Sequence, residues 1–417
     1  MPIKNAIYAQ SGGVTSVINA SACGVIERAR NYPEKIGKVF AAKNGIIGAL
    51  REELIDTSIE SLEDIAKLKH TPSGAFGSCR HKLPDAGDEY NRLIEVFRAH
   101  DIGYFFYNGG GDSQDTANKV AKMSADMGYP ITCIGIPKTV DNDLPFTDVC
   151  PGFGSVAKYV AVSTLEAGFD VASMAESSTK VFILEVMGRH AGWIAAASGL
   201  AGLKTHEPPH IILFPEIAFE PELFVKKVQQ CVADFGYCVV VTSEGIRNKD
   251  GNFLSDSGLT DAFGHKQLGG VAPVLANLIK QELGLKYHWA LADYLQRSAR
   301  HIASATDVEQ AYALGCHAVD FAVSGKNAIM PIIIRESDDP YKWSIGEVAL
   351  KDVANQEKKM PREYITADGF AITDECARYL APLIQGENYP PFKNGIPDYT
   401  KLKNTLIDKK LINYELP

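Results

Sequence analysis

The sequence lacks an excess of positive charge, a long apolar run and a hydrophobic leader after Met1. Its 417 residues carry 42 Lys and Arg against 51 Asp and Glu, and the net charge of −9 argues against nucleic acid or an anionic membrane as a partner. The longest stretch of small apolar residues, 193–203, contains two glycines and is too short to cross a bilayer. No apolar core of a signal peptide precedes the first predicted strand. These absences predict a soluble cytoplasmic protein with no nucleic-acid or membrane partner.

The sequence also lacks a closely spaced cysteine pair and any internal repeat. Its eight cysteines form no Cys-x-x-Cys motif, and several lie among apolar or small residues, as Cys133 does in ITCIG. They are therefore predicted to be reduced thiols of the core. No repeat or low-complexity segment divides the chain.

What the sequence does contain is a regular alternation of strand and helix patterns. Short apolar runs such as 102–107 and 131–136 are typical of parallel strands that are buried on both faces. Helical spacing follows most of these runs, and such alternation indicates an α/β fold with parallel sheets. A chain of 417 residues is too long for one core, so two or three domains are expected.

The most informative stretch is GIPKTVDNDLPFTD, which starts at Gly135. Pro137 ends a predicted buried strand because it has no N–H for the sheet, and a loop with one lysine, one threonine and two aspartates follows. Ligands of open α/β sheets bind beyond the carboxyl ends of the strands. A cation and two carboxylates at such a place can hold a metal–phosphate and take a proton from a hydroxyl. The alternative is an acidic surface turn, because Asp and Asn favour turns.

Two glycine-rich turns follow predicted strands elsewhere, at 11–13 and 109–113. Backbone N–H groups and a helix N-terminus can form a phosphate cradle at such turns, although SGG is equally typical of a plain turn between strand and helix. Ser113 is predicted to cap a helix that starts at Gln114. Asp112 is unusual there, because a carboxylate in a phosphate cradle either holds a divalent cation or repels part of a ligand.

Five motifs together resemble the phosphofructokinase family over roughly residues 3–330. They are SGG at 11–13, GGGDS at 109–113, PKTVDND at 137–143, MGRHAG at 187–192 and SEG at 243–245, and their order and spacing match. The resemblance implies two Rossmann-like three-layer α/β domains with parallel sheets, with the active site in the cleft between the domains, and a homodimer. It implies a phosphoryl-donor domain of 1–152 with 267–330, a fructose 6-phosphate domain of 153–266 with 331–385, and a C-terminal extension of 386–417.

The activity implied by the resemblance is phosphoryl transfer to the 1-hydroxyl of fructose 6-phosphate, giving fructose 1,6-bisphosphate. Asp141 would be the general base, an effect worth roughly 10²–10⁴ in rate. The resemblance places the donor against Gly12, Gly111, Ser113 and Arg80. It places the sugar phosphate against Thr139, Val140, Asp141, Lys180, Met187, Gly188, Arg189, Glu244, Tyr294 and Arg297. In this scheme Lys180 reaches the site of the neighbouring subunit, and the Tyr-x-x-Arg pattern at 294–297 serves the 6-phosphate.

Two further positions differ from the ATP-using members of the family and agree with the pyrophosphate-using members. Asp112 and Lys138 both stand where the ATP type has glycine. Glycine leaves room for a nucleotide α-phosphate, whereas a carboxylate blocks it and repels it by about 4 kcal/mol at ~4 Å and an effective dielectric constant of ~20. Lys138 would supply positive charge to the transferring phosphoryl group. Asp112 and Lys138 are therefore assigned to catalysis beside Asp141, with pyrophosphate as the donor and phosphate as the product.

The resemblance also implies Mg²⁺ as the cofactor. The pyrophosphate-using members usually carry an aspartate where this chain has Gly111. The ion would then be held by Asp112, Asp141 or Asp143, or mainly by pyrophosphate itself, and Asp112 and Asp143 are the assigned metal ligands.

Three alternatives remain at this stage. The first is an ATP-dependent phosphofructokinase that accommodates Asp112 and Lys138 around a nucleotide. The second is a non-catalytic sensor of sugar phosphates, although such a sensor has no need of the general base Asp141. The third is an enzyme that also accepts sedoheptulose 7-phosphate.

Overall fold

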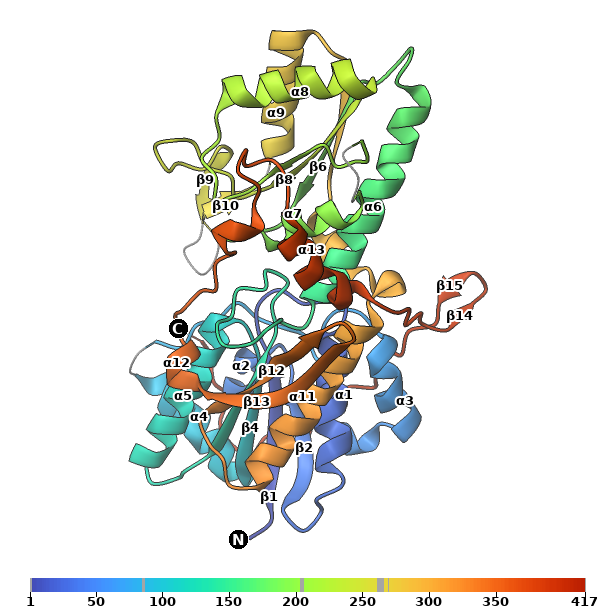
Figure 1. Ribbon diagram of the computed structural model, residues 1–417. Coiled ribbons are helices and arrows are strands. Elements are labelled where there is room, and N and C mark those ends of the chain that lie inside the picture. Colours follow the sequence, from blue (N-terminus) through green and yellow to red (C-terminus); the bar gives the residue numbers. More distant parts are fainter. Residues whose placement is uncertain (1, 85–86, 203–205, 261–265, 269, 417) are drawn as a thin grey trace.

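The computed structural model of the chain describes residues 2–84, 87–202, 206–260, 266–268 and 270–416. These residues form two α/β units, each built around its own sheet, which lie one above the other in Figure 1. The predicted α/β class with parallel sheets is confirmed. No helix in the described ranges has the length and apolarity needed to span a membrane.

The lower unit in Figure 1, the large unit, contains a seven-stranded sheet in the order β13-β12-β5-β4-β1-β2-β3. The strands from β12 to β2 pair in parallel, and the two edge strands are antiparallel. Central strands that are buried on both faces explain the continuous apolar runs of the sequence. The strands are β1 (Lys4–Gln10), β2 (Ile36–Ala42), β3 (Leu54–Asp56), β4 (Ile102–Gly109), β5 (Thr132–Pro137), β12 (Ile329–Asp338) and β13 (Tyr341–Ala349).

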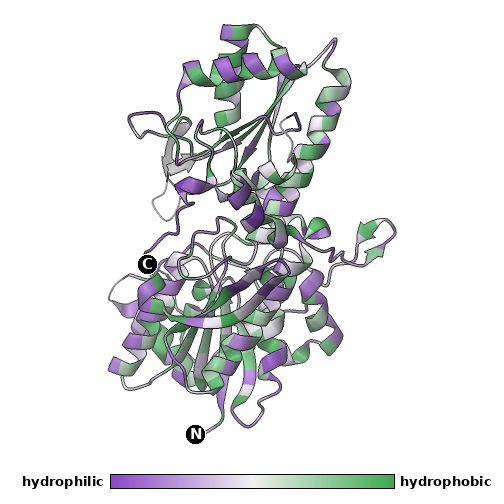
Figure 2. Ribbon diagram, viewed as in Figure 1, coloured by the Kyte–Doolittle hydropathy of each residue, from purple (hydrophilic) through white to green (hydrophobic). Residues whose placement is uncertain are grey.

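Helices cover both faces of this sheet, and Figure 2 shows apolar strands between helices that are polar on their outer sides. One face is packed by the first and the eleventh helix, and the other mainly by the fourth and fifth. The helices of the large unit are α1 (Ile18–Ala29), α2 (Ile46–Leu50), α3 (Leu62–Lys67), α4 (Asp88–Ala99), α5 (Gly111–Asp126), α11 (Ala305–Val323) and α12 (Leu350–Val353).

The upper unit, the small unit, contains a parallel four-stranded sheet in the order β11-β6-β8-β7. Its strands are β6 (Val181–Val186), β7 (Ile211–Leu213), β8 (Cys238–Ser243) and β11 (Tyr287–Leu291). Its helices are α6 (Phe153–Met174), α7 (Trp193–Ala197), α8 (Pro221–Phe235), α9 (Val271–Leu283), α10 (Asp293–Ser298) and α13 (Asp374–Leu380). Pro221 occupies the first turn of α8, and Gly236 ends this helix at φ 82°.

An apolar cluster joins the two units. Val140 and Ile333 from the large unit are buried in the same cluster as Trp193, Phe214 and Leu380 from the small unit. Because this surface is continuous and apolar, the carboxyl ends of the two sheets are held opposite one another rather than joined only by linkers.

The structure corrects two parts of the predicted division of the chain. Strand β11 lies within the predicted donor domain segment 267–330, but it pairs with β6 in the small unit. Strands β12 and β13 lie almost wholly within 331–385, but they complete the sheet of the large unit. The sequence pattern identifies a strand but not the strand with which it pairs. The predicted positions at which the chain passes from one unit to the other were therefore wrong.

Two pairs of antiparallel strands were also not predicted from the sequence. Strands β9 (Asp256–Thr260) and β10 (Lys266–Leu268) pair within 248–270, a segment whose many glycines and aspartates are more typical of a loop. Strands β14 (Phe392–Lys393) and β15 (Ile396–Pro397) form a small arm that projects from the body in Figure 1.

The C-terminal extension returns to the large unit and is anchored by Glu52. This side chain has no exposed surface, and its backbone has a positive φ of 58°. Its carboxylate accepts the backbone N–H groups of Lys410 at 2.6 Å and Leu411 at 3.1 Å, and lies 2.5 Å from Nε2 of His100. Burial alone would raise the pKa of Glu52, but these donors hold the pKa below its ordinary value.

Replacing Glu52 by glutamine should release the tail. The amide keeps the size of the side chain, but its NH₂ group cannot accept a backbone N–H, so one donor is left unpaired. A loss of about 2 kcal/mol in the free energy of unfolding is expected, measured by urea denaturation, together with faster proteolysis beyond Pro397. Because the pKa of Glu52 is lowered by folding, the difference should be complete at pH 7 and should shrink below about pH 4.

The matched control is Glu95→Gln, which changes an exposed glutamate of α4 in the same way. Equal tail proteolysis in the two variants would contradict the anchoring role of Glu52.

Candidate active site

A cavity of about 800 Å³ lies where the carboxyl ends of the two sheets face each other. The loops after β1, β4 and β5 line one side, and residues at or after the ends of β6, β8 and β11 line the other. This is the expected ligand position for open parallel sheets. All the predicted site residues except Lys180 and Gly188 line this cavity, namely Gly12, Arg80, Gly111, Asp112, Ser113, Lys138, Thr139, Val140, Asp141, Asp143, Met187, Arg189, Glu244, Tyr294 and Arg297.

The turn after β1 is held by the segment that carries Arg80. Ser11 forms a parallel bridge with Cys79, and the N–H of Gly12 donates to the carbonyl of Cys79 at 2.9 Å. Gly12 has φ 74°, which favours glycine. The N–H predicted to hold the donor is thus already engaged within the protein. In addition, the first helix starts only at Ile18, so its N-terminus does not directly follow this turn as it would in a phosphate cradle.

Three cations converge on this turn. A Cβ atom added to Gly13 would lie 2.5 Å from Nη1 of Arg297 and 3.8 Å from Nη2 of Arg80, and one added to Gly12 would lie 3.5 Å from Nζ of Lys138. Arg297 also stacks on Tyr294, with 4.0 Å from its guanidinium carbon to the ring centroid. Such a group of cations around a glycine turn is suited to a polyanion with closely spaced charges.

Burial has a large effect on Lys138. Lys138 is only 5% exposed, and this burial lowers its pKa to about 8. The nearby positive charge of Arg297 lowers the pKa as well. Asp141 and Asp143 oppose the shift. An ammonium held so close to its titration point is stabilised strongly by an anion, which is what a phosphate in the cavity would provide.

The turn after β4 differs from the prediction in its capping. Helix α5 starts at Gly111, with Gly110 at the N-cap, so Ser113 lies inside the first turn and does not cap the helix. Its hydroxyl lies where a Cβ of Gly109 would be, which explains why glycine is needed there. Asp112 lines the cavity and pairs with Lys82, with 2.8 Å between Oδ1 and Nζ.

The loop after β5 brings two carboxylates into the same cavity. Asp141 and Asp143 both line it, and the N–H of Asp141 donates to the hydroxyl of Thr139 at 3.1 Å. Burial, followed by the charge of Asp143 and then that of Glu244, raises the pKa of Asp141 to about 7. Burial also raises the pKa of Asp143. A half-buried carboxylate whose pKa lies near neutrality is suited to accept a proton from a hydroxyl group.

The small unit contributes a second cation and a carboxylate. Arg189 lines the cavity, and its buried Nε makes no hydrogen bond within the described ranges. Glu244 follows β8, and its N–H donates to the carbonyl of Val186 at 2.9 Å. Burial raises the pKa of Glu244, and the charge of Arg189 opposes this rise. An arginine and a carboxylate side by side can bind a sugar phosphate through its phosphate and its hydroxyl groups.

Two of the predicted residues lie outside the cavity lining. Gly188 lies between two residues that line the cavity, and its own backbone has φ 130°. Its carbonyl accepts a hydrogen bond from the hydroxyl of Ser243, so Gly188 shapes the turn. Lys180 precedes β6, at the opposite end of the strand from the cavity, and its ammonium donates to the carbonyl of Ala175. The reach of Lys180 to a neighbouring subunit stays a prediction.

Four acidic or basic residues line the cavity but were not predicted from the sequence. His190 belongs to the MGRHAG motif and could have been included, and Asp293 directly precedes the predicted Tyr294. Glu185 is a carboxylate inside an apolar strand, and it accepts the N–H of Ala272 at 2.7 Å near the start of α9. Glu357 pairs with His190 at 3.0 Å, but its polar segment gives no sequence signal, because only the fold brings it to the cavity.

The carboxylates of the cavity are of the type that binds divalent cations. No cluster of three or more His, Cys, Asp or Glu side chains that could hold an ion occurs among the residues that the structure describes. Mg²⁺, however, is usually bound through one or two carboxylates together with water and substrate phosphates. Asp141 and Asp143, with Asp112 across the same cavity, fit this second kind of site.

Comparisons with known proteins agree with this geometry. Residues 5–322 match the family described as phosphofructokinase. A protein of Methylococcus capsulatus named pyrophosphate–fructose 6-phosphate 1-phosphotransferase is 64% identical over 414 residues, with 99% of each chain covered. A protein of the same name from Halomonas elongata is 64% identical over 100% of each chain.

A solved structure is similar over its whole length. The crystal structure of a pyrophosphate-dependent phosphofructokinase from Marinobacter aquaeolei has a TM-score of 0.92 and 66% identity, with 99% of this chain and 100% of that chain covered. The chain therefore belongs to the phosphofructokinase family, as the five motifs along its sequence predict.

Proposed function

We propose that the chain is a pyrophosphate–fructose 6-phosphate 1-phosphotransferase. It transfers a phosphoryl group from pyrophosphate to the 1-hydroxyl of fructose 6-phosphate, which gives fructose 1,6-bisphosphate and phosphate. Relatives that are 64% identical over the whole chain carry this name. Little free energy separates the two sides because the donor is a simple anhydride, so the reaction is reversible and can serve glycolysis and gluconeogenesis.

The single observation that carries the mechanism is the position of Asp141. Its carboxylate lines the cavity between the cations of the large unit and those of the small unit, and its raised pKa lies near neutrality. A base in this position accepts the proton of the 1-hydroxyl as that oxygen attacks the terminal phosphorus. Lys138 and Arg80 then stabilise the charge on the transferring group and the leaving phosphate. Arg297, which the family resemblance assigns to the 6-phosphate, is proposed to join them, because its guanidinium lies at the same glycine turn.

The choice of donor follows from Asp112. The ion pair with Lys82 offsets much of its charge, so the side chain excludes a third phosphate more by its volume than by repulsion. Pyrophosphate has no third phosphate to exclude. An ATP-dependent enzyme would have to place a nucleotide over this ion pair, which makes ATP the weaker candidate.

Mg²⁺ is proposed as the cofactor, held by Asp143 and Asp112 together with oxygen atoms of pyrophosphate. When bound, it would neutralise charge on the phosphates as the P–O bond breaks. The mutual repulsion of Asp141 and Asp143 supports this assignment, because a divalent cation would relieve it.

We also propose that the working form is a homodimer in the cytoplasm. Strand β11 is a sheet edge that exposes Trp289 and Leu291 beside the cavity, and this supports a covering partner. The eight free thiols are in keeping with a reducing compartment. Light scattering should give twice the mass of one chain, and a mass equal to one chain would contradict the dimer.

Replacing Asp141 by asparagine should abolish turnover. The amide keeps the shape of the side chain but cannot accept the proton of the hydroxyl, so kcat should fall by about 10²-fold or more. Binding of fructose 6-phosphate, measured by calorimetry, should remain within a few-fold of the original. The control is Asp126→Asn, at the exposed end of α5. Activity of the Asp141 variant close to that of the control would remove Asp141 as the base.

The double replacement Asp112→Gly and Lys138→Gly should change the choice of donor. The loss of Lys138 should lower pyrophosphate-dependent kcat by about 10²-fold, and the loss of Asp112 should open room for a nucleotide. ATP binding, measured by calorimetry, should appear in the double variant and remain absent in Lys138→Gly alone. If ATP fails to bind to the double variant, exclusion by Asp112 does not explain the donor preference.

A further inference from the structure

Asn142, the residue between Asp141 and Asp143, is fixed in a strained backbone conformation beneath the cavity. It has φ 55° and no exposed surface. Asparagine tolerates this left-handed region better than most residues because its amide can form hydrogen bonds close to the backbone. The chain turns sharply at this point, so the conformation of Asn142 decides how the two flanking carboxylates are directed.

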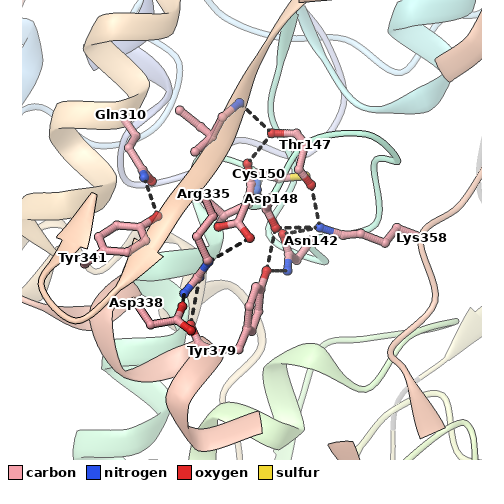
Figure 3. A network of polar contacts seen from close by, with 12 residues as sticks. Asn142, Thr147, Asp148, Cys150, Gln310, Arg335, Asp338, Tyr341, Lys358 and Tyr379 are labelled. Carbon is pink, nitrogen blue, oxygen red and sulfur yellow. Dashed lines mark hydrogen bonds and ion pairs between the residues drawn. The ribbon is translucent and has the colours of Figure 1, made fainter. Parts of the chain in front are cut away.

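The amide of Asn142 is held by three separate parts of the chain (Figure 3). Its Oδ1 accepts the N–H of Cys150 at 3.0 Å and a proton of Nζ of Lys358 at 3.3 Å. Its Nδ2 donates to the hydroxyl of Tyr379 at 3.0 Å. Cys150 belongs to the same loop, whereas Lys358 and Tyr379 come from more than 200 residues further along the chain.

Lys358 contacts this loop at four positions. Its ammonium donates to Asn142 and also to the carbonyl oxygens of Thr147 at 3.1 Å and Asp148 at 2.9 Å. Its own backbone N–H donates to the carbonyl of Asp143 at 2.6 Å. All three N–H bonds of the ammonium are therefore directed at the loop, as Figure 3 shows.

The loop is also supported around this lysine. Arg335 pairs with the carboxylate of Asp148 at 3.0 Å and donates to the carbonyl of Tyr379 at 3.0 Å. The hydroxyl of Tyr379 donates in turn to the carbonyl of Asp148 at 2.6 Å. Asp148 is paired with Arg335, and the charge of Lys358 also acts on the carboxylate of Asp143, whose pKa it lowers.

A lysine is a costly choice if only hydrogen bonds are needed. The three acceptors of its ammonium are neutral, and an ammonium removed from water is unfavourable unless opposite charge lies near. A neutral donor could satisfy the same carbonyl groups. The positive charge is explained if it acts on the carboxylate of Asp143, whose charge in turn acts on Asp141.

We propose that Lys358 is a positioning residue for the reaction, holding Asn142 in its left-handed conformation so that Asp141 and Asp143 both face the cavity. Its charge offsets the repulsion between the two carboxylates from the side opposite to the substrates. The role of Lys358 in turnover rests on the proposed function, whereas its hold on the loop does not.

The test compares Lys358→Met with Lys359→Met, which makes the same change at the next residue, an exposed one. In Lys358→Met, kcat for pyrophosphate-dependent phosphorylation should fall at least tenfold, while KM for fructose 6-phosphate should stay within about threefold. Amide hydrogen exchange should become faster at 138–150 and should be unchanged in α8 and α9. Lys359→Met should match the original protein in every readout.

Two results would overturn the proposal. One is a folded Lys358→Met protein with kcat within twofold of the original and unchanged exchange at 138–150. The other is faster exchange throughout the small unit, with kcat falling and KM rising together, since this would make Lys358 a general structural residue.

A second variant decides the matter if Lys358→Met does not fold. Tyr379→Phe removes one hydrogen bond to Asn142 but keeps the ammonium. A several-fold fall in kcat with unchanged KM and faster exchange at 138–150 supports the proposal, and unchanged kcat and exchange contradict it. If the original protein has no activity with pyrophosphate, the proposed function fails, and the exchange comparison alone decides the role of Lys358.

Discussion

The repulsion between two half-buried carboxylates, Asp141 and Asp143, is the constraint on which the rest of the site depends. Burial raises the pKa of both carboxylates, and the charge of Asp143, two residues away on the same loop, raises the pKa of Asp141 further. The roles proposed for them, a base and a metal ligand, both require that the pair stay in the cavity with its charge balanced. Lys138 and Arg189 supply that balance from the cavity side, and Lys358 supplies it from behind the loop.

The two-sheet architecture makes this arrangement possible. Each sheet ends its parallel strands at the same cavity, so short loops deliver side chains that are far apart in the sequence. The large unit contributes Lys138 and Arg80, and the small unit contributes Arg297, to the group of cations that suits a compact polyanion. The small unit also contributes Arg189 and Glu244, which suit a sugar phosphate. An apolar cluster fixes the two sets relative to one another, so neither unit alone would have a complete site.

Much of this could be predicted from the sequence because function here lies directly after strands. An apolar run followed by glycine or aspartate identifies a cavity-facing loop, as it did for Asp141 and for Gly12. Contacts between residues that are far apart in the sequence produce no such local pattern. Glu357 and Lys358 belong to a polar segment without helix or strand periodicity, so their positions at the site could not be predicted. The hydrogen bond from the N–H of Gly12 to Cys79 likewise depends on a contact between segments that are distant in the sequence. Strand β11 was placed in the wrong unit for the same reason.

The most direct test of the account compares phosphoryl donors for the unmodified protein. Initial rates with fructose 6-phosphate and Mg²⁺ would be measured with pyrophosphate and with ATP, each coupled to the appearance of fructose 1,6-bisphosphate. The account predicts turnover with pyrophosphate and none with ATP, because Asp112 occupies the place of a third phosphate and Lys138 stands where the ATP type has glycine. Turnover with ATP alone would contradict it, leaving the family and the base in place but removing the explanation of donor choice.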